Sequence, residues 1–304
     1  MKYILGRLTQ SLLALFTLLT LVFFSAHISG DPMDALLGDF AGEEQAEMLR
    51  REYGLDQALP VQFVKYLQRL AVGDLGISIS SQRPVSELIA QRIPASLELV
   101  FASLLVGLVI AIPLGVYSAV HRGGVFDAFA RFIALIGQSI PAFFQGLLMI
   151  VVFAIWLDLL PTSGRGGLAH LVMPSIVLGT GMAAGMLRLT RSAMIGTLES
   201  DYVKMARLKG LSERTVIWKH AFRNAVIPVF TYSAVLLATL VAGSIVTETV
   251  FAWPGLGQLV VDAVLLRDFP LIQGVVLFIG VFVLVTNLLV DLAYLVLDPR
   301  LRKG

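Results

Sequence analysis

The chain has 304 residues, of which 57% are hydrophobic and only 14% are charged. Soluble domains carry about 25% charged residues, so this composition excludes an ordinary soluble protein and indicates a membrane protein. The formal net charge of +2 favours no nucleic-acid partner, and the absence of cysteine excludes disulfides and thiolate chemistry within the chain.

The N-terminal segment, residues 1–29, is expected to contain the first membrane span. Its charge-free run from Leu8 to Ser29 covers 22 residues, and about 20 apolar residues cross a ~30 Å hydrocarbon core. A cleaved signal peptide is the alternative, although its apolar region usually has about 7–15 residues. The length of the run therefore favours a retained span.

A polar insertion follows at residues 30–93. Residues 43–53 are expected to form a helix that ends at Gly54. A second helix is expected to begin at Pro60 and to end near Gly73, because proline is favoured at the first helical position and glycine just past the last. Since the first span carries the chain across the membrane, the insertion is expected to be extracytoplasmic.

The remaining residues, 94–304, are expected to form the core of the protein. They contain five further apolar runs, at about 94–120, 132–157, 171–187, 228–246 and 271–297. Each run is long enough for a membrane-crossing helix, which needs roughly 17–25 residues. The sequence therefore predicts an all-α membrane protein with six transmembrane helices and a helical extracytoplasmic insertion between spans 1 and 2.

The third apolar run contains polar residues but no charge. These residues are Gln138, Ser139 and Gln145, with Pro141 among them. Polar groups and proline inside a span usually face protein or a water-filled cavity, so we interpret these residues as candidates for the lining of a pathway. Contact between helices is the alternative explanation. Glu248, which lies just past the fifth span, joins the candidate set.

A strongly basic loop, residues 188–228, separates the fourth and fifth spans. Its part from 188 to 224 holds eight of the 23 Lys and Arg residues, and a loop this basic beside membrane spans belongs on the cytoplasmic side. The expected inner segments together hold 15 of the 23, whereas the two short outer loops hold one each. This asymmetry predicts that both chain termini are cytoplasmic.

The basic loop has the pattern of two short amphipathic helices that meet at a glycine. Tyr202 and Ala206 share one helical face, and Gly210 supplies a stop suited to left-handed backbone. Ser212 can cap a second helix, which residues 216–221 continue at helical spacing. Such a corner could present a knob to a partner protein. A charged loop that only fixes the topology is the alternative interpretation.

The amino-acid sequence of this loop resembles that of a known protein family. The loop reads Asp201-Tyr-Val-x-x-Ala206-Arg207-x-Lys209-Gly210-Leu211-Ser212, followed by Lys219-His220-Ala221-x-Arg223-Asn224-Ala225-x-x-Pro228. This stretch resembles the cytoplasmic coupling loop of ATP-binding-cassette (ABC) importer permeases, and more narrowly that of their peptide/nickel branch. The general importer pattern is Glu-Ala-Ala, three residues and Gly, of which only Ala206 and Gly210 match. Those departures are typical of the peptide/nickel branch.

Other stretches carry the same resemblance, so it covers nearly the whole chain. They are Gly30-Asp31-Pro32, Gly73-Asp74-Leu75-Gly76-x-Ser78, and Glu248 with Trp253-Pro254-Gly255-Leu256-Gly257. The resemblance implies the type I importer architecture and a location in the inner (plasma) membrane among its lipids. It also implies that the insertion at 30–93 is either a solvated loop or a docking surface for a solute-binding protein.

The partners and the coupling residues are likewise implied by the resemblance. A second, related permease subunit would complete the pathway, two ATP-binding subunits would bind ATP and Mg²⁺, and an extracytoplasmic binding protein would deliver the solute. The residues expected to couple to the ATPase are Tyr202, Ala206, Arg207, Lys209, Gly210, Leu211, His220, Arg223 and Asn224, with Ala206, Gly210 and Leu211 as the knob. Peptides are the expected substrates; nickel, glutathione or another small solute is the alternative.

The motifs of catalysis and cofactor binding are missing from the sequence. It contains no Gly-x-x-x-x-Gly-Lys-Ser/Thr loop for ATP phosphates and no His-Glu-x-x-His or Gly-x-Ser-x-Gly motif. We therefore expect a non-catalytic permease without a metal site or cofactor of its own. An ion-coupled secondary transporter is the main rival, but the middle of every expected span is uncharged, which disfavours ion coupling.

Overall fold

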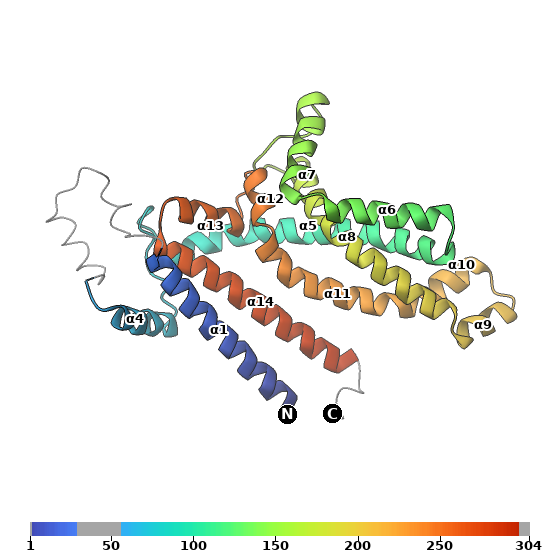
Figure 1. Ribbon diagram of the computed structural model, residues 1–304, viewed down its shortest axis with the longest axis horizontal. Helices are drawn as coiled ribbons and strands as arrows, with labels where there is room; N and C mark the ends of the chain where they lie inside the picture. The colour runs from blue at the N-terminus through green and yellow to red at the C-terminus, as the bar shows by residue number, and fades with distance from the viewer. Residues whose placement is uncertain (1, 29–55, 298–304) are drawn as a thin grey trace. The chain divides into compact units, whose positions relative to one another are not determined.

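The computed structural model describes residues 2–28 and 56–297 (Figure 1). Within those ranges the regular elements are helices, apart from one isolated antiparallel bridge between Ile77 and Pro84. The predicted all-α fold class is confirmed. The helix expected at residues 43–53 and the Gly30-Asp31-Pro32 stretch lie outside the described residues.

Every run expected to cross the membrane is helical. The long elements are α1 (Lys2–Ile28), α5 (Val85–Val120), α6 (Val125–Ser139) with α7 (Ala142–Met149) and the π-helical η2 (Ile150–Trp156), α8 (Leu168–Leu198), α11 (Phe222–Gly243) and α14 (Phe269–Leu297). By length and composition, α5, α8 and α14 can each cross a membrane, and the bent pair formed by α6 and α7–η2 would add a fourth span among the described residues. The count of six stays a prediction.

The helices differ from the expected spans in three places. The helix that contains the second span begins at Val85, before Pro94, and α5 continues through Pro94 and Pro113. The third span is broken at Pro141, where the two parts meet at 100°. The fourth span extends to Leu198, so the charged residues after Leu187 continue the helix and do not begin a loop. Helices α5 and α8 thus extend beyond the proline and the charges that were expected to bound them, whereas a proline interrupts the third span.

One compact unit comprises Met1–Ser96 and Pro254–Val285. It contains the amphipathic α4 (Leu59–Ala71), which has Pro at its start and Gly73 at φ +79° just past its end, as predicted. Phe23 of α1 packs against Phe63 and Tyr66 of α4, with ring centroids 5.1 Å and 5.7 Å apart. Burial raises the pKa of Tyr66 to about 12. These aromatic contacts fix α4 against α1.

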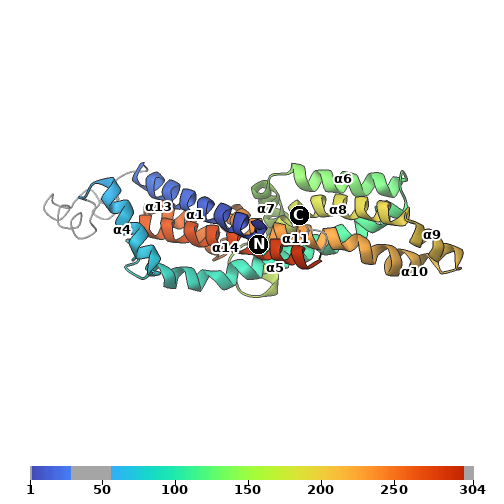
Figure 2. The ribbon, with the colours of Figure 1, turned by 90° about the horizontal axis from the view of Figure 1, so that it is seen from below.

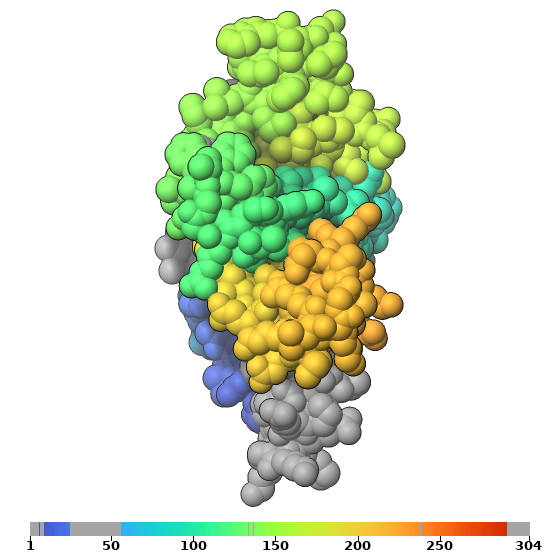
Figure 3. Space-filling view, turned by 90° about the vertical axis from the view of Figure 1, so that its right-hand side faces the viewer, coloured from blue at the N-terminus to red at the C-terminus, as the bar shows by residue number. Residues whose placement is uncertain are grey.

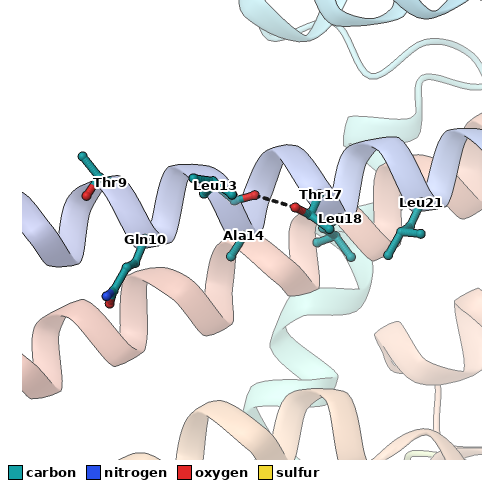
Figure 4. A pocket seen from close by; sticks show the side chains of 7 residues that line it. All are labelled: Thr9, Gln10, Leu13, Ala14, Thr17, Leu18 and Leu21. Atoms are coloured by element: carbon teal, nitrogen blue, oxygen red, sulfur yellow. Dashed lines mark hydrogen bonds between the residues drawn. The ribbon is translucent and has the colours of Figure 1, made fainter.

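A shallow groove of about 580 Å³ runs along α1 (Figure 4). It is lined by Thr9, Gln10, Leu13, Ala14, Thr17, Leu18 and Leu21. The hydroxyl of Thr17 donates to the backbone carbonyl of Leu13 at 2.8 Å, which leaves the groove wall largely apolar. Leu18 also packs against α14, since a Cβ at Gly280 would lie 2.1 Å from its Cδ2. The glycine therefore permits close approach of the two helices.

A buried carboxylate organises the turn before α14 in the same unit. Asp268 precedes α14, and its Oδ2 accepts from the hydroxyl of Ser78 at 2.6 Å and from the hydroxyl and backbone N–H of Ser80 at 2.8 Å and 3.0 Å. Its Oδ1 accepts from the N–H of Leu271 at 3.2 Å, which caps the first turn of α14. The Gly73–Ser78 motif is thus tied to the start of the last helix.

We expect Asp268→Ala to destabilise this turn by about 2 kcal/mol or more, because four donors, two of them in buried hydrogen bonds, lose their acceptor. Hydrogen exchange of the Ser80 amide should then accelerate at least about thirtyfold. Asp268→Asn keeps the shape and one acceptor oxygen, and it should have a smaller effect. Equal exchange in all three proteins would show that the carboxylate does not hold the turn.

The second compact unit comprises Leu97–Trp253 and Thr286–Gly304. Its central element is α8, which lies between α6 and α11 and against α5 (Figures 1 and 2). Small residues allow the close approach: a Cβ at Gly115 of α5 would lie 2.6 Å from the Cβ of Thr190, and one at Gly179 would lie 2.8 Å from the carbonyl oxygen of Ser103. The α5–α8 pair therefore behaves as one packed element.

Candidate functional site

The basic loop folds as predicted, as two short helices that meet at a glycine. Helix α9 spans Asp201–Leu208, and Gly210 follows it at φ +75°. Ser212 then caps α10 (Glu213–Thr215), where its hydroxyl accepts from the N–H of Thr215 at 3.4 Å, and η3 (Val216–Ala221) continues the chain into α11. The local signals for the stop and the cap were sufficient to predict this corner.

One face of the corner packs on the C-terminal ends of α5 and α8. Val203, Ala206 and Val216 are buried against Val116 of α5 and Met194 of α8. Ala206, one of the residues expected to form the knob, thus packs within this chain, and a contact between it and a partner stays a prediction. Ala206 is only 6% exposed, because it shares the helical face of Val203, and it seats the loop on the helix bundle.

The opposite face carries the exposed residues. Leu208 is 82% exposed, and Met205 and Leu211 are also exposed. Arg207 forms a double hydrogen bond to Glu213 across the corner, at 2.9 Å and 3.3 Å, while Lys209 stays exposed. The result is an apolar tip with a basic rim. Figure 3 views the molecule from the end that carries this loop. The sequence analysis did not include Met205 and Leu208 among the residues of this tip. Their apolar side chains next to a charged turn were the signal that could have indicated them.

The other predicted coupling residues lie around the corner. Tyr202 accepts a hydrogen bond from the side-chain amide of Asn224 at 2.7 Å, which links α9 to α11. His220 is partly buried in η3, and Arg223 is exposed at the start of α11. Among the described residues, neither His220 nor Arg223 makes a side-chain hydrogen bond or ion pair. The hydrogen bond between Tyr202 and Asn224 therefore holds two parts of the loop together.

A buried ion pair lies close behind this corner. Asp127 is 1% exposed and accepts from Arg191 through both oxygens, at 2.8 Å and 2.9 Å. It also accepts from the hydroxyl of Ser118 at 2.5 Å and from the N–H of Gly123 at 3.0 Å. This cluster joins α5, α6 with the turn before it, and α8. Sequence reasoning missed it, because the two partners are 64 residues apart.

The candidate pathway residues have different surroundings. Gln145 of α7 donates to the hydroxyl of Thr180 in α8 at 2.8 Å, a contact between helices. Gln138 accepts from Arg188 at 3.0 Å, and Ser139 donates to the carbonyl of Leu135 at 2.8 Å. Gln138 and Ser139 are exposed, whereas Gln145 is partly buried. Gln138 and Gln145 therefore both make contacts between helices, and the lining of a pathway stays a prediction. Pro141 is exposed at the break between α6 and α7.

Glu248 does not lie on an exposed surface of this chain. It is fully buried in α12 (Ile245–Val250) and accepts from the hydroxyl of Ser244 at 2.8 Å. Its backbone carbonyl accepts from the N–H of Trp253, also at 2.8 Å. Arg165 pairs with Glu98 at 2.6 Å and lies 6.0 Å from the centre of the Trp253 ring. Glu248 therefore belongs to the packed turn that ends in the Trp-Pro-Gly motif.

The comparison with known proteins decides the family. Residues 111–303 match the family described as "Binding-protein-dependent transport system inner membrane component", and residues 1–100 match its N-terminal counterpart. The chain belongs to this family. It is therefore a permease subunit of an ABC importer, a multi-pass protein of the inner membrane.

Relatives of the chain match it over nearly its whole length. It is 40% identical over 303 residues, 99% of both chains, to the glutathione transport system permease protein GsiC of Escherichia coli strain K12 and to that of Pectobacterium atrosepticum. The solved MetNI methionine ABC transporter, in an inward facing conformation, shares the fold with a TM-score of 0.58 at 21% identity, over 69% of this chain and 96% of that chain. An amino acid ABC transporter gives 0.51 at 14% identity, over 68% and 92%.

Proposed function

We propose that this chain forms part of the translocation pathway of an ATP-driven importer for small peptides, glutathione included. The observation that carries the substrate class is the full-length, 40% identity to permeases of glutathione transport systems. Glutathione is itself a short peptide, so one pathway chemistry serves both. Nickel or another small solute is the alternative cargo of the same importer class.

The proposal assigns ATP hydrolysis to partner subunits. The sequence has no phosphate-binding loop, and Mg²⁺ and ATP would be held by two ATP-binding subunits beneath the membrane. A second permease subunit would complete the pathway, and an extracytoplasmic binding protein would dock on the outer segments and deliver the solute. The asymmetry of Lys and Arg supports cytoplasmic termini.

The exposed tip of the coupling loop supports contact with an ATPase. Leu208 and Leu211 are apolar and exposed, which favours a protein partner over water. Because Val203 and Ala206 pack directly on Met194 and Val116, a displacement of the tip would move the inner ends of α8 and α5. Closure of the ATP-binding subunits would thereby bias the pathway between two arrangements.

The direct test is uptake into proteoliposomes by the complex purified through a tag on this chain. Labelled glutathione and labelled dialanine should enter only when ATP and Mg²⁺ are present on the side of the ATP-binding subunits and the binding protein is present on the opposite side. An ATP analogue that resists hydrolysis should block uptake. Uptake of neither peptide by an active, solute-stimulated ATPase would contradict the substrate class. Uptake by this chain alone, driven by an ion gradient, would contradict the importer mechanism.

A further inference from the structure

One face of α8 is open in the folded chain. Gly181, Arg188, Ser192 and Gly196 are exposed and follow one another at spacings of seven, four and four residues, which places them on one side of a helix. A Cβ at Gly181 or Gly196 would meet no atom within 4 Å. The opposite side of α8 carries Met186, Leu187 and Thr190, which are buried in the core of the unit. A face with glycine, serine and arginine is poorly suited to lipid tails.

Arg188 is the charge on this open face. It lies 20 residues after the start of α8 at Leu168, or about 30 Å along the helix, a distance about equal to the thickness of the hydrocarbon core. Its guanidinium donates to the side-chain oxygen of Gln138 at 3.0 Å. Charged residues at such depth face the protein interior or water, because lipid disfavours them. Gln138 holds the guanidinium against α6.

The neighbouring Arg191 differs from Arg188, because it has a carboxylate partner within the chain. Both oxygens of Asp127 accept from Arg191, which is therefore neutralised by a carboxylate of the chain. Within the described ranges, 2–28 and 56–297, no acidic side chain pairs with Arg188. A guanidinium has five N–H donors in a planar fork, so one amide oxygen leaves most of them for another acceptor.

We propose that Arg188, held by Gln138, binds the carboxylate of a peptide as it passes along the inner part of the pathway. The planar fork of an arginine matches a carboxylate with two parallel hydrogen bonds, and every unblocked peptide carries such a group at its C-terminus. This inference rests on the proposed peptide-import function and adds a recognition site to it. The site binds the anionic end of a solute in preference to a cationic end.

The absence of cysteine makes this inference testable through a single introduced thiol. Ser192→Cys places the thiol one turn from Arg188 on the same exposed face. The assembled importer with this change is treated with an anionic and a cationic methanethiosulfonate reagent, and labelling of this chain is followed by mass. Arg188→Gln should lower the anionic-to-cationic ratio of labelling rates about fivefold, since a unit charge about 8 Å away changes each rate by a factor of about 2–3 in opposite directions.

A second measurement tests the carboxylate itself. Dialanine at high concentration should slow labelling of the thiol by the anionic reagent, whereas dialanine amide, which lacks the carboxylate, should not. Arg188→Gln should abolish the protection by dialanine. Arg188→Lys should keep the rate ratio, because the charge remains, but should weaken protection, because the two-pronged contact is lost.

The matched control is Arg122→Gln, which removes the same charge from an exposed pair with Glu199. It should leave both the ratio and the protection unchanged. A thiol that reacts with neither reagent in any nucleotide state would show that another subunit covers this face, and an unchanged ratio in Arg188→Gln would show that the guanidinium attracts no anion there. Either result overturns the proposal. Failure of the peptide-import function would be seen separately, as an absence of ATP-dependent dialanine uptake by the unmodified complex.

Discussion

Replacing Asp127 with alanine should destabilise the end of the helix bundle at which α5, α6 and α8 meet by about 3–5 kcal/mol. The carboxylate is almost fully buried and is the acceptor for Arg191, Ser118 and Gly123. Removal of one partner of such a pair leaves a charge and several donors without compensation, which costs more than the pair itself contributes. Thermal unfolding of the purified complex should therefore begin at a clearly lower temperature.

A double variant separates the effect of an unpaired charge from the effect of lost packing. Asp127→Leu combined with Arg191→Met replaces both partners by apolar side chains and should recover most of the lost stability. Arg122→Gln removes one partner of a pair whose side chains are 63% and 68% exposed, and exposed pairs contribute about 0–1 kcal/mol, so it should change little. If Asp127→Ala unfolds at the temperature of the unchanged protein, the cluster does not hold the three helices together.

This ion pair also lies close to the residues on which the basic loop packs. Arg191 is one helical turn from Met194, whose side chain forms part of the core on which Val203 and Ala206 sit. Loss of Asp127 should therefore weaken coupling as well as stability. The double variant tells the two effects apart, because it restores packing near Met194 without restoring the polar cluster.

The features that the sequence predicted best are those with local causes. The stop at Gly210, the cap at Ser212 and the helix that begins at Pro60 each depend on the conformational preference of one or two residues, and all three are present. The helical character of the apolar runs likewise follows from composition. These features need no knowledge of which parts of the chain meet.

The features that the sequence did not predict depend on contacts between distant residues. The end of the fourth span was placed before Arg188, because charge was expected to mark a loop, yet α8 continues to Leu198 with Asp127 and Gln138 as partners for its arginines. The inward position of Ala206 could not be distinguished from an outward one, because both faces of α9 carry apolar residues. Only the packing on α5 and α8 decides between them.

Gly210→Val should strongly weaken the coupling of ATP hydrolysis to transport while leaving the protein folded and in the membrane. Gly210 has φ +75°, a conformation that a β-branched residue adopts only with strain of about 1–3 kcal/mol. The strain can be relieved if the turn changes shape, which would move Leu211 and α10 away from the exposed tip formed with Leu208. Stimulation of the ATPase by the loaded binding protein should fall about fivefold or more, the change in an equilibrium that such an energy produces.

The surroundings of Gly210 make the interpretation of this result unusually direct. A Cβ at this position would meet no atom within 4 Å, so a larger side chain meets no steric obstacle in the chain and the effect must come from the backbone or from a partner. Gly210→Asn separates these two causes, because asparagine tolerates left-handed backbone, and its side chain is close in size to that of valine. Activity in the asparagine variant with loss in the valine variant would assign the effect to the turn. Loss in both would assign it to space that a partner occupies, and normal coupling in both would show that the tip does not need this geometry.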